Sequence, residues 1–201
     1  MPNWCSTTYI CTGRKKSIKK LYHVLTELSK GESRIKNDFG NLWLGNVVDS
    51  LGGNWEEIRC RGKIMSYNLD PKTRDLIIYQ ETAWCEQSEF RYFLESKLQG
   101  LKIYYLEEES GCEIYYTNDA TGLYFPDRYI LECEGIDDGY YEYYSDFNKM
   151  ILDVEDFTEE KFTGPKTEEG LNEYLNEFNE RPENYDNGIS CYYHKILYSE
   201  N

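Results

Sequence analysis

Hydrophobic and polar positions follow two different periods along the first 106 residues, and the periods predict two kinds of element. Apolar side chains at every second position predict strands, and apolar side chains three or four positions apart predict helices. Gly31 and Gly100 follow two of the helical runs and are typical helix stops. The pattern predicts strands at 4–12, 58–64, 76–84 and 101–106, and helices at 15–30, 42–51 and 86–99.

The order of these elements predicts how the sheet is connected. A helix between two strands can carry the chain back to lie parallel in the same sheet, and such crossovers are right-handed. We therefore expect the strands that start near residues 5, 58, 75 and 101 to form one antiparallel sheet. Helices 15–30 and 86–99 should pack together on one of its faces.

Beyond residue 106 the predicted elements are shorter. Thr167 can cap a helix at its N-terminus, with acidic residues in the first turn and an apolar face that runs to Phe178. Residues 146–161 fit either a helix or a short strand at 150–154. Further strands are expected at 112–116, 128–133, 140–144 and 189–198.

Several short stretches occur along the chain in an order that points to a known family. They are Pro2-Asn3-Trp4-Cys5, Cys60-Arg61-Gly62, Glu81-Thr82-Ala83-Trp84, Asn118-Asp119 and Tyr124-Phe125-Pro126-Asp127-Arg128-Tyr129. In this set the chain resembles the YubB-type ferredoxin-like domain, whose members occur in bacterial genomes, plasmids and phages and have no known biochemical function. The resemblance covers residues 1–135 and brings no catalytic residues with it.

The resemblance and the hydrophobic pattern agree on the fold class. Both predict an α+β protein with a ferredoxin-like βαββαβ antiparallel sheet, two helices on one face, and extra strands. The composition changes at Gly135, so we expect a ferredoxin-like domain at 1–135 and a C-terminal α+β appendage at 136–201. This acidic, tyrosine-rich extension is expected to pack on the same domain.

The net charge of −15 is unevenly distributed along the chain. Residues 1–100 hold 15 Lys and Arg against 12 Asp and Glu, whereas residues 101–201 hold 7 against 25. The second half also holds 15 of the 20 tyrosines. Such asymmetry bears on partners and solubility more than on the fold. It predicts an acidic, tyrosine-rich surface for a basic protein partner.

Location and cofactors are predicted from what the chain lacks. It has no run of about 18 apolar residues, so no membrane span is expected. It has no signal-peptide pattern at its N-terminus, so a cytoplasmic protein is expected. The seven cysteines are odd in number and form no Cys-x-x-Cys pair, and there are only two histidines. Reduced cysteines, no metal and no cofactor are therefore expected.

Three sets of basic or aromatic residues are candidates for binding. Arg59, Arg61 and Lys63 would share one face of their predicted strand and could contact an anion or nucleic acid, unless carboxylates such as Glu81 neutralise them. Trp84 precedes a predicted helix and could stack on a ligand or close the edge of the core. Lysines on the polar face of the first helix could meet phosphates or simply be solvated; they are Lys15, Lys16, Lys19 and Lys20.

Three hypotheses of function follow from these candidates. The first is a non-enzymatic binding protein, associated with mobile elements through its family, whose acidic residues contact a basic partner; its candidates are Glu155, Asp156, Glu159 and Glu160. The second is nucleic-acid binding through the sheet face and the basic first helix, which the net charge disfavours. The third is an enzyme with an unrecognised carboxylate site, such as the pair Glu132 and Glu134. Among sequence motifs of enzymes, no phosphate-binding loop, dinucleotide motif or serine triad is present.

Overall fold

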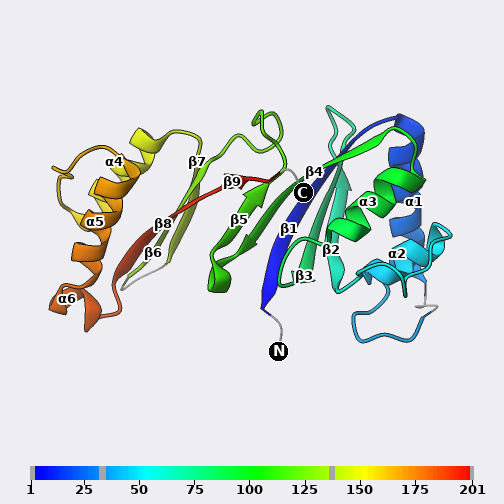
Figure 1. Ribbon diagram of the computed structural model, residues 1–201, viewed down its shortest axis with the longest axis horizontal. Helices are drawn as coiled ribbons and strands as arrows, with labels where there is room; N and C mark the ends of the chain where they lie inside the picture. The colour runs from blue at the N-terminus through cyan, green and yellow to red at the C-terminus, as the bar shows by residue number, and fades with distance from the viewer. Residues whose placement is uncertain (1–2, 32–34, 136–138, 200–201) are drawn as a thin grey trace. The chain divides into compact units, whose positions relative to one another are not determined.

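The computed structural model describes residues 3–31, 35–135 and 139–199, and the chain divides into two compact units (Figure 1). Unit 1 comprises Met1–Ala120 with Tyr198–Asn201, and unit 2 comprises Thr121–Leu197. Both units combine helices and strands, which confirms the predicted α+β class. The division lies near residue 120, and not at the predicted boundary near 135.

Unit 1 is built on a six-stranded sheet with the strand order β2-β3-β1-β4-β5-β9. β1 lies between β3 and β4 and is antiparallel to both, and β2 is antiparallel to β3. β4 is likewise antiparallel to β5. The strands are β1 (Trp4–Gly13), β2 (Gly62–Leu69), β3 (Leu76–Ala83), β4 (Leu101–Glu109), β5 (Ile114–Thr117) and β9 (Leu197–Tyr198).

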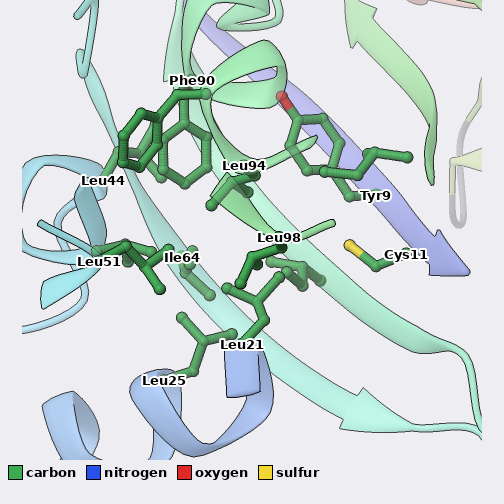
Figure 2. Packing of buried hydrophobic residues seen from close by; sticks show 14 of the residues in the cluster. Tyr9, Cys11, Leu21, Leu25, Leu44, Leu51, Ile64, Phe90, Leu94 and Leu98 are labelled. Carbon is green, nitrogen blue, oxygen red and sulfur yellow. The ribbon is translucent and has the colours of Figure 1, made fainter. Parts of the chain in front are cut away.

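Three helices of unit 1 lie on the same side of this sheet (Figure 1). They are α1 (Lys15–Lys30), α2 (Leu44–Ser50) and α3 (Ser88–Lys97). In β1 every second residue points inward, so that Tyr9 and Cys11 meet Leu21 of α1 and Leu94 of α3 (Figure 2). The prediction that both long helices cover one face is confirmed, and α2 packs against each of them.

The turns at one end of the sheet require glycine. Gly13 ends β1 with a φ of 110°, and a Cβ atom there would lie 2.2 Å from the carbonyl oxygen of Gly100. The same carbonyl accepts a 2.9 Å hydrogen bond from the backbone N–H of Arg14. No side chain fits at position 13, because the backbone of the turn at Gly13 is in direct contact with the backbone of the turn at Gly100.

β2 begins four residues later than predicted, at Gly62 instead of Ile58. The preceding backbone is held mainly by side chains from the start of α3, and β3 reaches it at one point, where the N–H of Ala83 donates to the carbonyl of Arg61 at 2.8 Å. The carboxylate of Glu89 accepts the N–H of Arg59 at 2.8 Å, and the side-chain oxygen of Gln87 accepts the N–H of Arg61 at 3.3 Å. These long-range contacts override the local alternation.

Unit 2 has its own sheet and its own core. The sheet has the order β7-β6-β8, and its core joins Leu131 of the sheet to Val154 and Leu175 of two helices. The elements are β6 (Tyr129–Glu134), β7 (Tyr140–Tyr144), α4 (Phe147–Thr158), α5 (Glu168–Asn179), α6 (Pro182–Tyr185) and β8 (Ser190–Lys195). The predicted extension is thus a unit that also takes in β6.

The structure also decides the two helix predictions in unit 2. Residues 147–158 form a helix because Asp146 accepts the N–H of Asn148 at 2.8 Å and the apolar side chains of the helix are buried. The Thr167 cap is confirmed, since its hydroxyl accepts the N–H of Gly170 at 3.1 Å. Within the described residues, no helix is long and apolar enough to cross a membrane.

Candidate functional site

The three cations predicted to share one strand face are separated in the structure. Only Lys63 lies on β2, and its Nζ atom is 3.5 Å from Oε2 of Glu81 on β3. Arg59 and Arg61 precede the strand, are exposed, and form no ion pair within the part of the chain that the structure describes. The predicted stripe is therefore wrong as a strand face, although Lys63 has the carboxylate neighbour that was anticipated.

Arg61 and Lys63 nevertheless line one cavity of about 450 Å³. Two aromatic rings form part of its wall, those of Trp4 and Phe39, whose centroids are 6.2 Å apart in an edge-to-face arrangement. The lining residues are Trp4, Asp38, Phe39, Arg61, Lys63, Glu81 and Ala83. Two cations face two carboxylates, so the cavity has no preference for an anion.

Trp84 does not close the edge of the core, because its side chain is 41% exposed. It follows Ala83, a lining residue of this cavity, and donates its backbone N–H to the carbonyl of Asn3 at 2.9 Å. Its φ of 74° is a left-handed conformation that bulky residues seldom adopt. An exposed ring on a constrained backbone is a suitable surface for stacking.

The four acidic residues predicted as a contact surface differ in their environments. Glu155 accepts hydrogen bonds from Nζ of Lys161 at 2.6 Å and from the N–H of Phe162 at 3.0 Å, and these contacts lower the pKa of its carboxyl. The carboxylate of Glu160 accepts two hydrogen bonds from the Arg181 guanidinium, at 2.6 and 2.9 Å, and these lower the pKa of Glu160. Only Asp156 and Glu159 have no ion pair within the described residues.

A second acidic surface lies on α5 and was not singled out from the sequence. Glu169, Glu173 and Glu177 are each four residues apart, are exposed, and make no ion pair within residues 139–199. Residues at this spacing are neighbours on one face of a helix. The sequence contains a signal for this surface, because the predicted apolar face of the helix implies a polar face on which these three glutamates lie. We call these three residues the α5 acidic face.

A buried polar cluster in unit 1 was also missed. The carboxylate of Glu86 accepts a hydrogen bond from the hydroxyl of Tyr9 and lies 3.0 Å from Nε of Arg91. The carboxylate of Glu107 accepts the backbone N–H of Glu86 at 2.6 Å. The thiol of Cys5 lies 3.9 Å from the same Glu107 carboxylate. One sequence signal existed, namely an arginine among the apolar positions of α3.

Burial controls the ionisation of this cluster. It raises the pKa of Glu86, although the Arg91 guanidinium opposes the shift, and it raises the pKa of Glu107. Raised carboxyl pKa values are common in active sites, but they also occur in structural networks. The side chains of Arg91 and Glu86 are only 2% and 5% exposed, so a substrate could not reach them. The cluster is therefore a structural network in this conformation.

Other candidates contribute little. Glu132, one of the carboxylate pair considered for hydrolysis, lies 3.2 Å from Nε2 of His194, and Glu134 is exposed on the same strand. Across residues 3–31, 35–135 and 139–199, no three His, Cys, Asp or Glu side chains are grouped to hold a metal ion.

Comparison with models of protein families, with curated proteins and with solved structures found no significant match. What the protein binds must therefore be inferred from its own residues.

Proposed function

We propose that the protein is a non-enzymatic binding protein whose unit 2 contacts a basic protein through the α5 acidic face. The observation that supports this most directly is that Glu169, Glu173 and Glu177 are exposed on one helix face and have no ion pair in the described part of unit 2. Adjacent like charges destabilise a helix by about 0.2–0.5 kcal/mol per pair. A basic partner would relieve this repulsion.

The distribution of charge between the units supports the same proposal. Unit 2 holds 19 acidic and 6 basic side chains, whereas unit 1 holds 18 and 16. A field of one sign accelerates the approach of an oppositely charged partner. The three carboxylates repeat about every 6 Å along the helix axis, which resembles a line of phosphate charges. A protein that normally binds nucleic acid is thus a suitable class of partner.

The test compares two triple variants with the same loss of charge. E169Q/E173Q/E177Q removes the α5 acidic face, and E134Q/E142Q/E183Q removes three exposed carboxylates from β6, β7 and α6. The probe is a 20-residue lysine–glycine repeat peptide, with association rates measured by surface plasmon resonance from 20 to 300 mM salt. We expect at least a fivefold lower rate for the first variant and less than a twofold change for the second.

Salt supplies a further check of this proposal. Charges on a flat exposed surface are screened over about 10 Å at 0.1 M ionic strength, so wild-type association should slow steeply with salt. Equal effects of the two triple variants would show that total charge matters and the α5 face does not. Glu155 and Glu160 are poor sites for this test, because their carboxylates already bond to Lys161, Phe162 and Arg181.

The second candidate function is nucleic-acid binding through unit 1. The basic side of α1 and the exposed Arg61 favour it, whereas the net charge opposes it because phosphate neutralisation dominates such binding. Titration with single-stranded RNA at 150 mM salt distinguishes nucleic-acid binding from the binding of a basic protein. If RNA binds and R59Q/R61Q/K63Q abolishes the binding, this candidate replaces the first.

We also propose that unit 1 is a ferredoxin-like domain of the YubB type. The neighbour order of β4, β1, β3 and β2, their antiparallel pairing and the placement of α1 and α3 on one face support this. The proposal implies a mobile-element context and a cytoplasmic location. A solved structure of an authentic family member that superposes on these four strands with the same register would test it.

A further inference from the structure

A second cavity in unit 1 lies where the β2–β3 turn meets the first turns of α1. It has a volume of about 320 Å³, close to the lower end of the range for small-molecule sites. Its lining residues are Lys15, Ile18, Lys19, Leu69 and Arg74. Three cationic and two aliphatic side chains thus line the cavity.

The charges of this cavity are of one sign. Lys15 and Lys19 are one helical turn apart and exposed, and Arg74 is exposed on the facing turn. None of the three makes an ion pair within residues 3–31, 35–135 and 139–199, and no carboxylate is among the lining residues. Such a concentration of positive charge is unusual in a chain with a net charge of −15.

The nearest acidic residues in sequence do not neutralise these cations. The carboxylate of Asp70 accepts the backbone N–H groups of Lys72 and Thr73, each at 2.7 Å, and so stabilises its own turn. These hydrogen bonds lower the pKa of Asp70. Asp75 forms no ion pair with the three cations. The Asp70 carboxylate is therefore used within its own turn, and the guanidinium of Arg74 remains available to a ligand.

The backbone of the turn holds Arg74 in place. Its φ is 67°, in the left-handed region where glycine fits without strain. Its N–H donates to the carbonyl of Asp70 at 3.0 Å, and the N–H of Asp70 donates to the carbonyl of Asp75 at 2.9 Å. Glycine would adopt this conformation more easily than arginine does. The turn therefore carries a guanidinium group at the cost of backbone strain at Arg74.

We propose that this cavity binds the phosphoryl group of a small organic phosphate of nucleotide size. A guanidinium can donate two parallel hydrogen bonds to phosphate oxygens, and the two ammonium groups add point charges. Three cations favour a group of charge near −2 over a singly charged carboxylate. Ile18 and Leu69 supply apolar contact for the organic part.

This inference does not depend on the proposed function. The cavity belongs to unit 1 and the α5 acidic face to unit 2, and the two would take ligands of opposite charge. The experiments are therefore separable. Loss of peptide binding through α5 leaves the phosphate site untouched, and the reverse also holds.

The test is calorimetric titration of the full chain with AMP and with inorganic phosphate at 50 mM salt. The variant K15Q/K19Q removes two lining cations, and K16Q/K20Q is its matched control. The control changes the same residue type, with the same spacing, on the same helix. We expect K15Q/K19Q to weaken AMP binding at least tenfold and the control to change it less than twofold.

Arg74 provides an independent arm. R74G should weaken AMP binding at least tenfold. It should also raise the melting temperature, because glycine adopts a positive φ without strain. The control K72Q, in the same turn, should change AMP binding less than twofold. Loss of binding with higher thermal stability cannot be a folding defect. Since K15Q/K19Q alters only exposed side chains, it decides the proposal even if R74G were to fold poorly.

Three results would overturn the proposal. The first is no AMP binding by the wild type at millimolar concentration. The second is equal binding of inorganic phosphate and AMP, because Ile18 and Leu69 would then contribute nothing to the affinity. The third is an equal effect of K15Q/K19Q and K16Q/K20Q, on AMP or on single-stranded RNA, which would indicate diffuse attraction to the whole helix face.

Discussion

At the residue scale, the Arg91 guanidinium is enclosed by one carboxylate and two aromatic rings. Its Nε atom is 3.0 Å from Oε1 of Glu86, and its central carbon is 4.4 Å from the ring centroid of Tyr92 and 5.0 Å from that of Tyr105. Removing one member of a buried pair leaves an uncompensated charge, which is more damaging than removing both.

We therefore predict that R91M destabilises unit 1 by about 3–5 kcal/mol. The double variant E86Q/R91M should be more stable than R91M alone, because no buried charge is left without a partner. All four tryptophans lie between residues 4 and 84, so tryptophan fluorescence during urea unfolding reports on unit 1. A loss below 1 kcal/mol for R91M would contradict the assignment of a buried ion pair.

Glu107 gives a prediction about pH. Burial raises its pKa above the ordinary value of 4.5, so the folded protein holds this proton more readily than the unfolded chain does. The stability that Glu107 contributes is complete below pH 4.5 and is lost as the pH rises through the folded-state pKa. The difference in unfolding free energy between wild type and E107Q should therefore shift in favour of E107Q from pH 4 to 7.5. If the difference in unfolding free energy between wild type and E107Q stays constant over this pH range, the raised pKa of Glu107 is disproved.

At the element scale, the pairing of β6 with β8 places two cysteines directly opposite each other. Cys133 is in register with Cys191, and their sulfur atoms are 2.6 Å apart. Both thiols are buried, and the hydrogen bond with the Cys133 sulfur, together with burial, raises the pKa of Cys191. Oxidation should accordingly be slow, since the thiolate is the reactive form.

We predict that prolonged treatment with diamide nevertheless oxidises this pair to a disulfide, because its two sulfur atoms are already in contact. In a C112S background, which removes the exposed cysteine, the thiol count under denaturing conditions should fall from six to four. C112S/C133S should keep five thiols before and after treatment. Closing a loop of this length stabilises a fold by about 4 kcal/mol in chain-entropy terms, so unit 2 should melt at a higher temperature. An unchanged count in the C112S background would exclude the pair.

At the scale of the whole molecule, the two units differ in charge more than in architecture. Unit 2 carries a balance of −13 and unit 1 one of −2. Repulsion within unit 2 weakens as salt rises, because exposed charges are screened beyond the Debye length. Salt should therefore stabilise unit 2 more than it stabilises unit 1.

We predict that raising salt from 20 to 300 mM increases hydrogen-exchange protection in α5 severalfold and changes α3 little. The two like-charge pairs of the α5 acidic face oppose the helix by about 0.2–0.5 kcal/mol each at low salt. Peptide-resolved exchange measured by mass spectrometry follows both helices in one sample. E169Q/E173Q/E177Q should remove the salt response of α5. A response that persists in this variant would locate the repulsion elsewhere in unit 2.

The sequence by itself determined the elements that depend on neighbouring residues. Periods of two and of about 3.6 located β1, β3, β4, α1 and α3 of unit 1, and Thr167 marked the start of α5 through a local cap. The connection rules for strands and helices also predicted that α1 and α3 lie on one face. These features follow from short-range sterics and hydrogen bonding, which a linear pattern contains.

Only the tertiary structure decided which distant residues meet. The side chains of Glu89 and Gln87 accept the backbone N–H groups of Arg59 and Arg61, which lie just before the start of β2. The cavity that joins Lys15 and Lys19 to Arg74 depends on a turn that approaches from more than 50 residues away. Such groupings arise from packing between elements, and packing is not encoded in the spacing of any single segment.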